Sequence, residues 1–182
     1  MTSGGHPGDL VVWLLRHAKA MPDPPSGGDD HDRLLAPRGR RDAAALGDRL
    51  GAGDLGFAAA ALPGLVLAST AARTTETAER VAAPLGIPVD RRQRLYYGTP
   101  TDVLDELRGI DDAIRSVMVV GHNPATHSLA LELLSTDDAG RAALGSFPTC
   151  AVAVFRTGAS HWPEVAFGTA TLVGFARPPY DG

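Results

Sequence analysis

The sequence predicts an α/β protein, a single-domain three-layer α/β/α sandwich with a mostly parallel central sheet and an antiparallel edge strand. Two observations predict it. Short apolar runs alternate along the chain with segments of helical composition, which is the order typical of parallel strands joined by helices. Three of these runs, at 11–15, 65–68 and 117–120, are continuously apolar. Because such runs are typical of strands buried on both faces, we expect these three at the centre of the sheet.

Length and composition limit the class of protein. The 182 residues, 44% apolar and 21% charged, suit one globular domain with a sizeable core. A net charge of −4 offers no basic surface for nucleic acid. No apolar run approaches the roughly 20 residues that span a bilayer, and the first ten residues lack the pattern of a secretion signal. The single cysteine excludes an internal disulfide. We therefore expect a cytoplasmic protein with neither nucleic-acid nor membrane partners.

We expect residues 1–9 to be a flexible lead-in and residues 10–182 to form the domain. After the first strand, residues 21–32 are too rich in Pro, Gly and Asp for regular structure. This segment is either a lid or wall of a pocket or an ordinary surface loop. Pro37 opens a helix with one apolar and small-residue face, which Gly51 and Gly53 end. The run at 57–62 fits neither a helix nor a strand clearly.

The rest of the chain continues the alternation. After the strand at 65–68, Ser69 and Thr70 are expected to cap a helix over 71–83. Residues 87–89 predict a short edge strand, and 101–107 a helix capped by Thr101. The strand at 117–120 is followed by a helix over 125–134. Strands at 151–155 and 165–173, joined by a loop at 158–163, predict an antiparallel hairpin at one edge of the sheet.

Polar side chains with a shared chemistry follow the three buried strands. Because the carboxyl ends of parallel strands meet at one edge of a sheet, where ligands of such folds bind, we expect these side chains to converge. They are Arg16 and His17 after the first strand, Ser69 and Arg73 after the second, and His122 and Asn123 after the third. Singly, an arginine such as Arg73 on a helix is more often a solvated surface charge, and His122 is also explained as a satisfied histidine in a turn. Together they form a site for a tetrahedral dianion, because guanidinium groups and helix N-termini pair well with phosphate oxygens.

The histidines add reactivity to this anion site. A neutral imidazole is a competent nucleophile toward phosphorus near neutral pH. A second imidazole, if it is protonated, donates a hydrogen bond to an oxygen of the phosphoryl group as charge develops there.

Three blocks of sequence resemble the histidine phosphatase superfamily, which has the phosphoglycerate-mutase-like fold. Residues 15–20 (LRHAKA) resemble its Arg-His-Gly/Ala signature, residues 68–78 (ASTAARTTETA) its second block, and residues 120–124 (VGHNP) its third. The blocks occur in the order and spacing of the family. The ending Ala-Lys-Ala, the segments at 33–35 and 38–39 and the Gly-His-Asn-Pro turn are most similar to the SixA-type bacterial phosphohistidine phosphatases.

The resemblance implies a role for each residue. His17 takes the phosphoryl group and forms a phosphohistidine that water later hydrolyses, while Arg16, Arg73 and His122 hold the phosphate oxygens. Ser69 and Asn123 are weaker candidates for phosphate binding and are equally explained as cap and turn residues. The resemblance implies neither a metal nor another cofactor. It leaves the oligomeric state open.

One departure from the family pattern bears on the substrate. Mutases and many phosphatases of the superfamily have a glutamate that protonates the leaving group in the region of residues 95–98, where this chain has Tyr97. The nearest acidic residues are Asp102, Asp105 and Glu106, for which a solvated surface is the simpler role. An alkoxide leaving group needs a proton donor, whereas a phosphoramidate or phosphoanhydride leaving group needs one less. The departure therefore favours phosphohistidine or another labile phosphoryl donor.

The sequence leaves three functional hypotheses. The leading one is a metal-independent phosphatase with a phosphohistidine enzyme intermediate, acting on phosphohistidine of a protein. The same residues also suit a phosphatase of a small phosphorylated metabolite or nucleotide. A catalytically silent phosphate-binding or interaction module is the alternative of another class. The presence of both histidines with both arginines counts against it.

Overall fold

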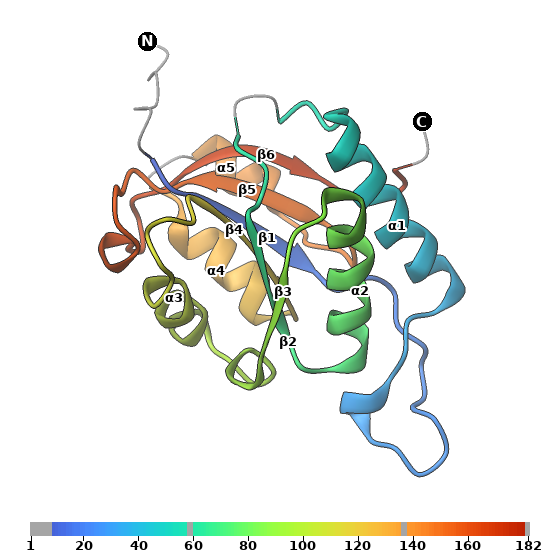
Figure 1. Cartoon of the computed structure of the whole chain (residues 1–182). Helices are drawn as coiled ribbons and strands as arrows, with labels where there is room; N and C mark the ends of the chain where they lie inside the picture. The colour runs from blue at the N-terminus through green and yellow to red at the C-terminus, as the bar shows by residue number, and fades with distance from the viewer. Residues whose placement is uncertain (1–8, 58–59, 136–137, 181–182) are drawn as a thin grey trace.

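The computed structural model describes residues 9–57, 60–135 and 138–180, and it contains a six-stranded sheet with helices on both faces (Figure 1). The strand order is β3-β2-β4-β1-β5-β6. Strands β1 to β4 are mutually parallel, whereas β5 runs antiparallel to β1 and β6 antiparallel to β5. This confirms the predicted fold class, including the antiparallel hairpin at one edge. The strands are β1 (Val11–Arg16), β2 (Leu65–Ser69), β3 (Val89–Arg92), β4 (Ser116–Gly121), β5 (Val152–Arg156) and β6 (Thr171–Ala176).

The helices form the two outer layers. On one face α1 (Pro37–Ala52) lies beside α2 (Ala72–Ala82), and on the other α3 (Pro100–Arg108) lies near α4 (Ala125–Leu133) (Figure 1). A short helix α5 (Asp138–Ala143) precedes the hairpin. Short 3-10 turns lie at Asp30–Asp32, Ala83–Leu85, Gln93–Leu95 and Trp162–Glu164.

Strand β1 is buried on both of its faces, as its unbroken apolar sequence predicts. Val12 and Leu14 pack in the core beneath α3 and α4, while Trp13 and Leu15 pack in the core beneath α1 and α2. Full burial of side chains of this size stabilises a fold by roughly 1.5–3 kcal/mol each. The end of β1, where Arg16 and His17 follow, is therefore held rigidly.

Two glycines of α1 allow the backbone to approach its neighbours closely. At Gly47 a β-carbon would lie 2.9 Å from the carbonyl oxygen of Arg80 in α2. At Gly39 a β-carbon would collide with the carbonyl oxygen of Lys19, two residues after His17. The first turn of α1 thus packs directly on the segment that leaves β1.

Several predicted boundaries are wrong. Ala71, not Ser69 or Thr70, is the N-cap residue of α2, and it makes no side-chain capping bond. Thr99, not Thr101, caps α3, because its hydroxyl accepts a hydrogen bond from the backbone of Asp102 and is followed by proline in the first turn. Strand β6 begins at Thr171 rather than at residue 165, since Gly168 adopts a left-handed conformation that ends any extended run before it.

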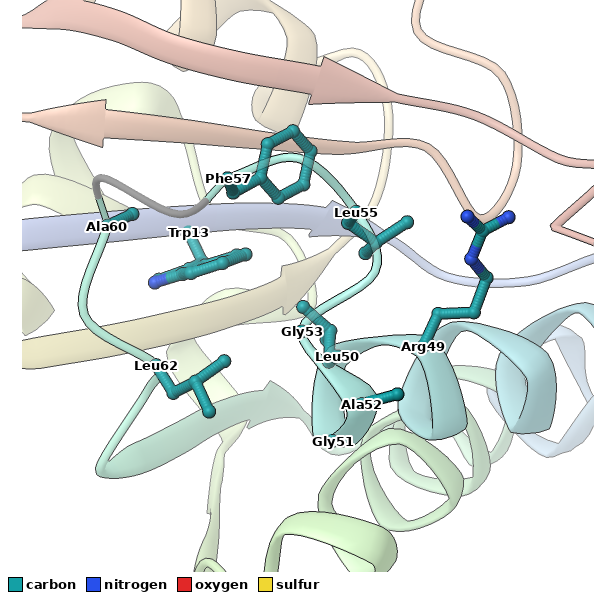
Figure 2. A pocket seen from close by; sticks show the side chains of 10 residues that line it. All are labelled: Trp13, Arg49, Leu50, Gly51, Ala52, Gly53, Leu55, Phe57, Ala60 and Leu62. Atoms are coloured by element: carbon teal, nitrogen blue, oxygen red, sulfur yellow. The ribbon is translucent and has the colours of Figure 1, made fainter.

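A small apolar hollow of about 210 Å³ lies beside α1, away from the strand ends (Figure 2). The Trp13 ring packs edge-to-face on Phe57 there, with ring centroids 5.7 Å apart. Its indole N–H donates to the carbonyl of Ala61 and lies at the same distance, 3.1 Å, from the Ser116 hydroxyl. Trp13 is therefore a core residue with its polar atom paired.

Two further expectations concern the N-terminal segment and the membrane. All of the predicted lead-in except Asp9 lies outside the described residues, so the domain boundary at residue 10 stays a prediction. Within the described ranges, none of the helices is both long and apolar enough to cross a membrane. The cytoplasmic location likewise stays a prediction.

Candidate active site

The ends of three neighbouring strands, β2, β4 and β1, open into a cleft of about 380 Å³. Its lining comes from the segments at the ends of the three strands and from three further segments: the loop before α1, the segment after β3 and the segment before β5. The residues are Arg16, His17, Lys19, Ala20, Asp30, Arg33, Arg73, Tyr96, Tyr97, His122, Asn123 and Thr149. The structure thus brings Arg16, His17, Arg73, His122 and Asn123 together from segments up to about a hundred residues apart. Ser69 is buried directly behind them.

His17 is fixed in one tautomer by its own backbone neighbour. Its Nδ1 lies 2.8 Å from the carbonyl oxygen of Ala18. A carbonyl only accepts, so Nδ1 carries the proton and Nε2 carries the lone pair. Burial foremost, together with the charges of the nearby arginines, lowers the pKa of His17 to about 4 against the opposing effect of that hydrogen bond. His17 is therefore a neutral imidazole with a free lone pair at neutral pH, as a nucleophile requires.

His122 lies against His17, with ring centroids 5.2 Å apart. Its Nε2 is 2.9 Å from the hydroxyl of Ser69, while its Nδ1 is buried without a hydrogen-bond partner. Burial, the neighbouring His17 and the charge of Arg73 lower its pKa to about 3. The protonated form of His122, which the donor role considered from the sequence requires, is therefore disfavoured in the free cleft.

Arg16 and Asn123 share one anchor. Arg16 Nη1 and Asn123 Nδ2 both donate to the carbonyl of Phe147, at 2.9 and 3.0 Å. Burial lowers the pKa of Arg16. Arg16 Nε and Asn123 Oδ1 are buried without partners. Together with His122 Nδ1 these are the only partnerless buried side-chain polar atoms among the described residues, and such atoms are typical of a ligand site.

Arg73 is paired with a residue that sequence reasoning missed. The Arg73 side chain is nearly buried, and both of its terminal nitrogens donate to Asp30: Nη1 to the backbone carbonyl at 2.6 Å, Nη2 to the carboxylate at 2.9 Å. Asp30 belongs to the loop at 21–32, which is therefore a wall of the cleft. An isolated antiparallel bridge between Ala20 and Leu35 closes the base of this loop.

The Asp30 carboxylate has two further partners. Arg33 donates to it at 2.9 Å and the hydroxyl of Tyr96 at 3.1 Å. These bonds, that of Arg33 foremost, together with Arg73, hold the pKa of Asp30 at about 2 against the opposing effect of burial. Asp30 is thus ionised throughout the physiological range. Nothing in the Asp-rich sequence of the loop distinguishes it from Asp29 or Asp32.

The acidic residues considered as proton donors do not line this cleft. The Asp102 carboxylate accepts a hydrogen bond from the hydroxyl of Thr99 and pairs with Arg94. Asp105 also pairs with Arg94. Glu106 lies 3.7 Å from Arg92. Tyr97, at the place of the family glutamate, does line the cleft, and it is 85% exposed. Of the residues that line the cleft, only Asp30 is a carboxylate.

The described part of the chain holds no cluster of three or more His, Cys, Asp or Glu side chains arranged to bind a metal ion. The positive side chains that line the cleft are those of Arg16, Arg33, Arg73 and Lys19.

Comparison with known proteins shows the family of this chain. The model of the histidine phosphatase superfamily (branch 1) matches residues 12–96. A protein named as a putative phosphohistidine phosphatase SixA, from Nakamurella multipartitia, has a solved structure with a TM-score of 0.79 and 31% identity, over 94% of this chain and 98% of that one. The chain belongs to the histidine phosphatase superfamily.

Other similar proteins cover nearly as much of the chain. A second SixA protein of the same description, from Agrobacterium tumefaciens, is 30% identical over 93% of this chain and 99% of that chain, with a TM-score of 0.75. The uncharacterized protein Rv1276c of Mycobacterium tuberculosis is 40% identical over 90% of this chain and 99% of its own length. The mycobacterial glucosyl-3-phosphoglycerate phosphatase Rv2419c, 19% identical over 90% of this chain and 96% of that one with a TM-score of 0.59, shares the fold.

Proposed function

We propose that this protein is a phosphatase that removes the phosphoryl group from phosphohistidine on a protein, through a phosphohistidine formed at its own His17. One observation carries the proposal: the cleft holds a neutral histidine nucleophile among cations, and its single carboxylate is ionised. Such a site can accept a phosphoryl group, but it offers a poor proton donor to an alkoxide.

The first step is an in-line attack. His17 Nε2 forms a bond to phosphorus while the bond from phosphorus to the substrate nitrogen breaks, and the electron pair of that bond stays on the nitrogen. Arg16 and Arg73 neutralise the phosphoryl oxygens, and His122 donates a hydrogen bond to them from Nδ1. Asn123 contributes a donor only when its Nδ2 exchanges its backbone carbonyl acceptor for a phosphoryl oxygen, since its unpartnered Oδ1 is an acceptor. Charge neutralisation by these side chains makes the proposed step independent of a metal ion.

The second step is hydrolysis. Water attacks the phosphorus of the His17 adduct and the bond from phosphorus to Nε2 breaks, with its electron pair returning to Nε2. Inorganic phosphate leaves with the protons of the water, one of which it releases to solvent. The Nδ1–H bond to the Ala18 carbonyl persists through both steps. His17 therefore returns to the tautomer from which it started.

Similar proteins support the substrate class. Two structures at 30% and 31% identity carry the name phosphohistidine phosphatase. The alternative, a small phosphorylated metabolite, draws on a relative at 19% identity, which speaks for the fold alone.

The test compares three phosphoryl donors in the presence of a chelator: a protein phosphorylated on histidine, p-nitrophenyl phosphate and glycerol phosphate. We expect turnover of the phosphohistidine protein, little turnover of glycerol phosphate, and loss of activity in His17→Ala. His161→Ala is the matched control, since His161 is an exposed histidine paired with Asp112 outside the cleft. Rapid hydrolysis of glycerol phosphate would show that a proton donor is present. Activity that survives in His17→Ala would refute the nucleophile.

A further inference from the structure

Asp30 covers the arginine that is expected to hold the phosphoryl group. The Arg73 side chain is 8% exposed and that of Asp30 is 56% exposed, so the carboxylate lies on the solvent side of the guanidinium. Both terminal nitrogens of Arg73 donate to Asp30. An incoming phosphoryl oxygen that pairs with Arg73 must therefore displace the carboxylate or share the guanidinium with it.

When a substrate displaces the Asp30 carboxylate from Arg73, two other hydrogen bonds still hold the carboxylate at the mouth of the cleft. Arg33 donates to Oδ1 and the hydroxyl of Tyr96 to Oδ2. A substrate thus meets Asp30 on the side from which it enters.

The surroundings of this carboxylate suit a flat nitrogen heterocycle. The Tyr96 ring packs edge-on against two imidazoles, those of His122 and His31, with centroids 5.7 and 4.8 Å away. The ring centroid of Tyr97 lies 4.2 Å from that of Tyr96, and the Tyr97 side chain is largely exposed. An aromatic wall with a carboxylate beside it offers an imidazole both ring contacts and an acceptor for its N–H.

We infer that Asp30 is a specificity-determining residue of this cleft: it opposes binding of free phosphate at Arg73 and accepts a hydrogen bond from the distal N–H of a leaving imidazole. The inference rests on the proposed function. It adds a reason why the site needs no proton donor.

Counting the protons of the two imidazoles shows why the transfer needs no proton donor. A phosphoimidazole whose distal nitrogen is protonated departs as neutral imidazole, because the electron pair of the broken P–N bond stays on the ring. His17 enters as neutral imidazole with its proton on Nδ1 and becomes the same kind of phosphoimidazole, so no proton moves during the transfer. Asp30 serves the leaving ring as the Ala18 carbonyl serves His17.

The test uses Asp30→Asn, with Asp32→Asn as the matched control from the same turn, since Asp32 does not line the cleft. Two quantities are measured for each protein: inhibition by inorganic phosphate, and the ratio of kcat/KM for N-phosphoimidazole to kcat/KM for p-nitrophenyl phosphate. In Asp30→Asn we expect phosphate to inhibit about two- to fivefold more strongly, as loss of a part-exposed ion pair implies. We expect the ratio to fall about ten- to a hundredfold, as loss of a charged hydrogen bond implies. Asp32→Asn should change neither.

The outcomes separate this inference from the proposed function. Weaker phosphate inhibition or an unchanged ratio in Asp30→Asn overturns the inference and leaves the phosphatase assignment standing. Failure of the wild-type protein to turn over N-phosphoimidazole, while it turns over p-nitrophenyl phosphate, overturns both. Asp30→Glu, which restores the carboxylate, should recover most of the ratio. Asp30→Ser replaces Asp30→Asn if the latter does not fold.

Discussion

The two histidines of the cleft are predicted to remain neutral far into the acidic range. Burial lowers the pKa of His17 to about 4 and that of His122 to about 3. The exposed His161 is the internal contrast, because its hydrogen bond to Asp112 raises its pKa above the ordinary value. Acidification to pH 5.5 should therefore charge His161 and leave the cleft histidines uncharged.

The expected difference is large enough to measure. At pH 5.5 an imidazole with a pKa of about 4 is roughly 3% protonated, whereas one with the ordinary pKa of about 6.5 is roughly 90% protonated. Nitrogen-15 NMR of the imidazole rings distinguishes these states and also the tautomer. His17 should show a protonated Nδ1 and a bare Nε2, because Nδ1 donates to the Ala18 carbonyl.

The same shift links stability to pH. The unfolded chain binds a proton at each histidine near pH 6.5, whereas folded His17 binds one only near pH 4, so the unfolded state holds more protons between these values. The free energy of unfolding therefore falls as the pH falls through that window. For His17 the loss is about 3 kcal/mol, at roughly 1.4 kcal/mol per pH unit.

Urea unfolding at pH 7 and pH 5 measures about 2 kcal/mol of this loss, because the interval covers only part of the window between the two pKa values. His17→Gln removes the titrating group, so the variant should lose less stability than the wild-type protein over the same interval. A His17 resonance that titrates near pH 6.5, or equal acid sensitivity of the two proteins, would refute the argument from burial.

Two further predictions concern residues at the edge of the cleft. Gly39→Ala should lower the free energy of unfolding by about 1–3 kcal/mol, because the new methyl group collides with the Lys19 backbone. Urea denaturation measures this, with Gly109→Ala as the control, since a β-carbon there makes only ordinary contacts; equal stability of the two would contradict it. Arg73→Lys should lower kcat/KM about a hundredfold, because an ammonium cannot pair with two oxygens as a guanidinium does. Steady-state kinetics test this, and a near wild-type rate would show that Arg73 does not bind the phosphoryl group.

The fold was predictable wherever one local signal dominates. The continuous apolar runs of β1, β2 and β4 are typical of strands buried at the centre of a parallel sheet. The bounds predicted for these three strands agree with the structure to within a residue. The errors lie at helix caps, where neighbouring residues compete. Both Thr99 and Thr101 have capping side chains, and the proline at position 100 favours the first.

The convergence of the cleft residues was predictable from topology, because parallel strands deliver their ends to one edge. The pairing of Arg73 with Asp30 was not. Asp30 is 43 residues away in an irregular loop, and the conformation of that loop depends on the bridge between Ala20 and Leu35 and on packing at Gly39. No periodic pattern encodes such tertiary contacts.

The electrostatics of the free cleft also decide where its positive charge comes from. Each histidine is buried among arginines and beside the other, so protonation of either adds charge to a site that is already cationic. A bound phosphoryl dianion reverses this balance, since it favours a protonated imidazole next to it. The donor role considered from the sequence for the second imidazole requires its protonation, and we expect that condition to be met by His122 only in the loaded site. In the free site the positive charge is on the arginine side chains and Lys19, and His17 keeps its lone pair.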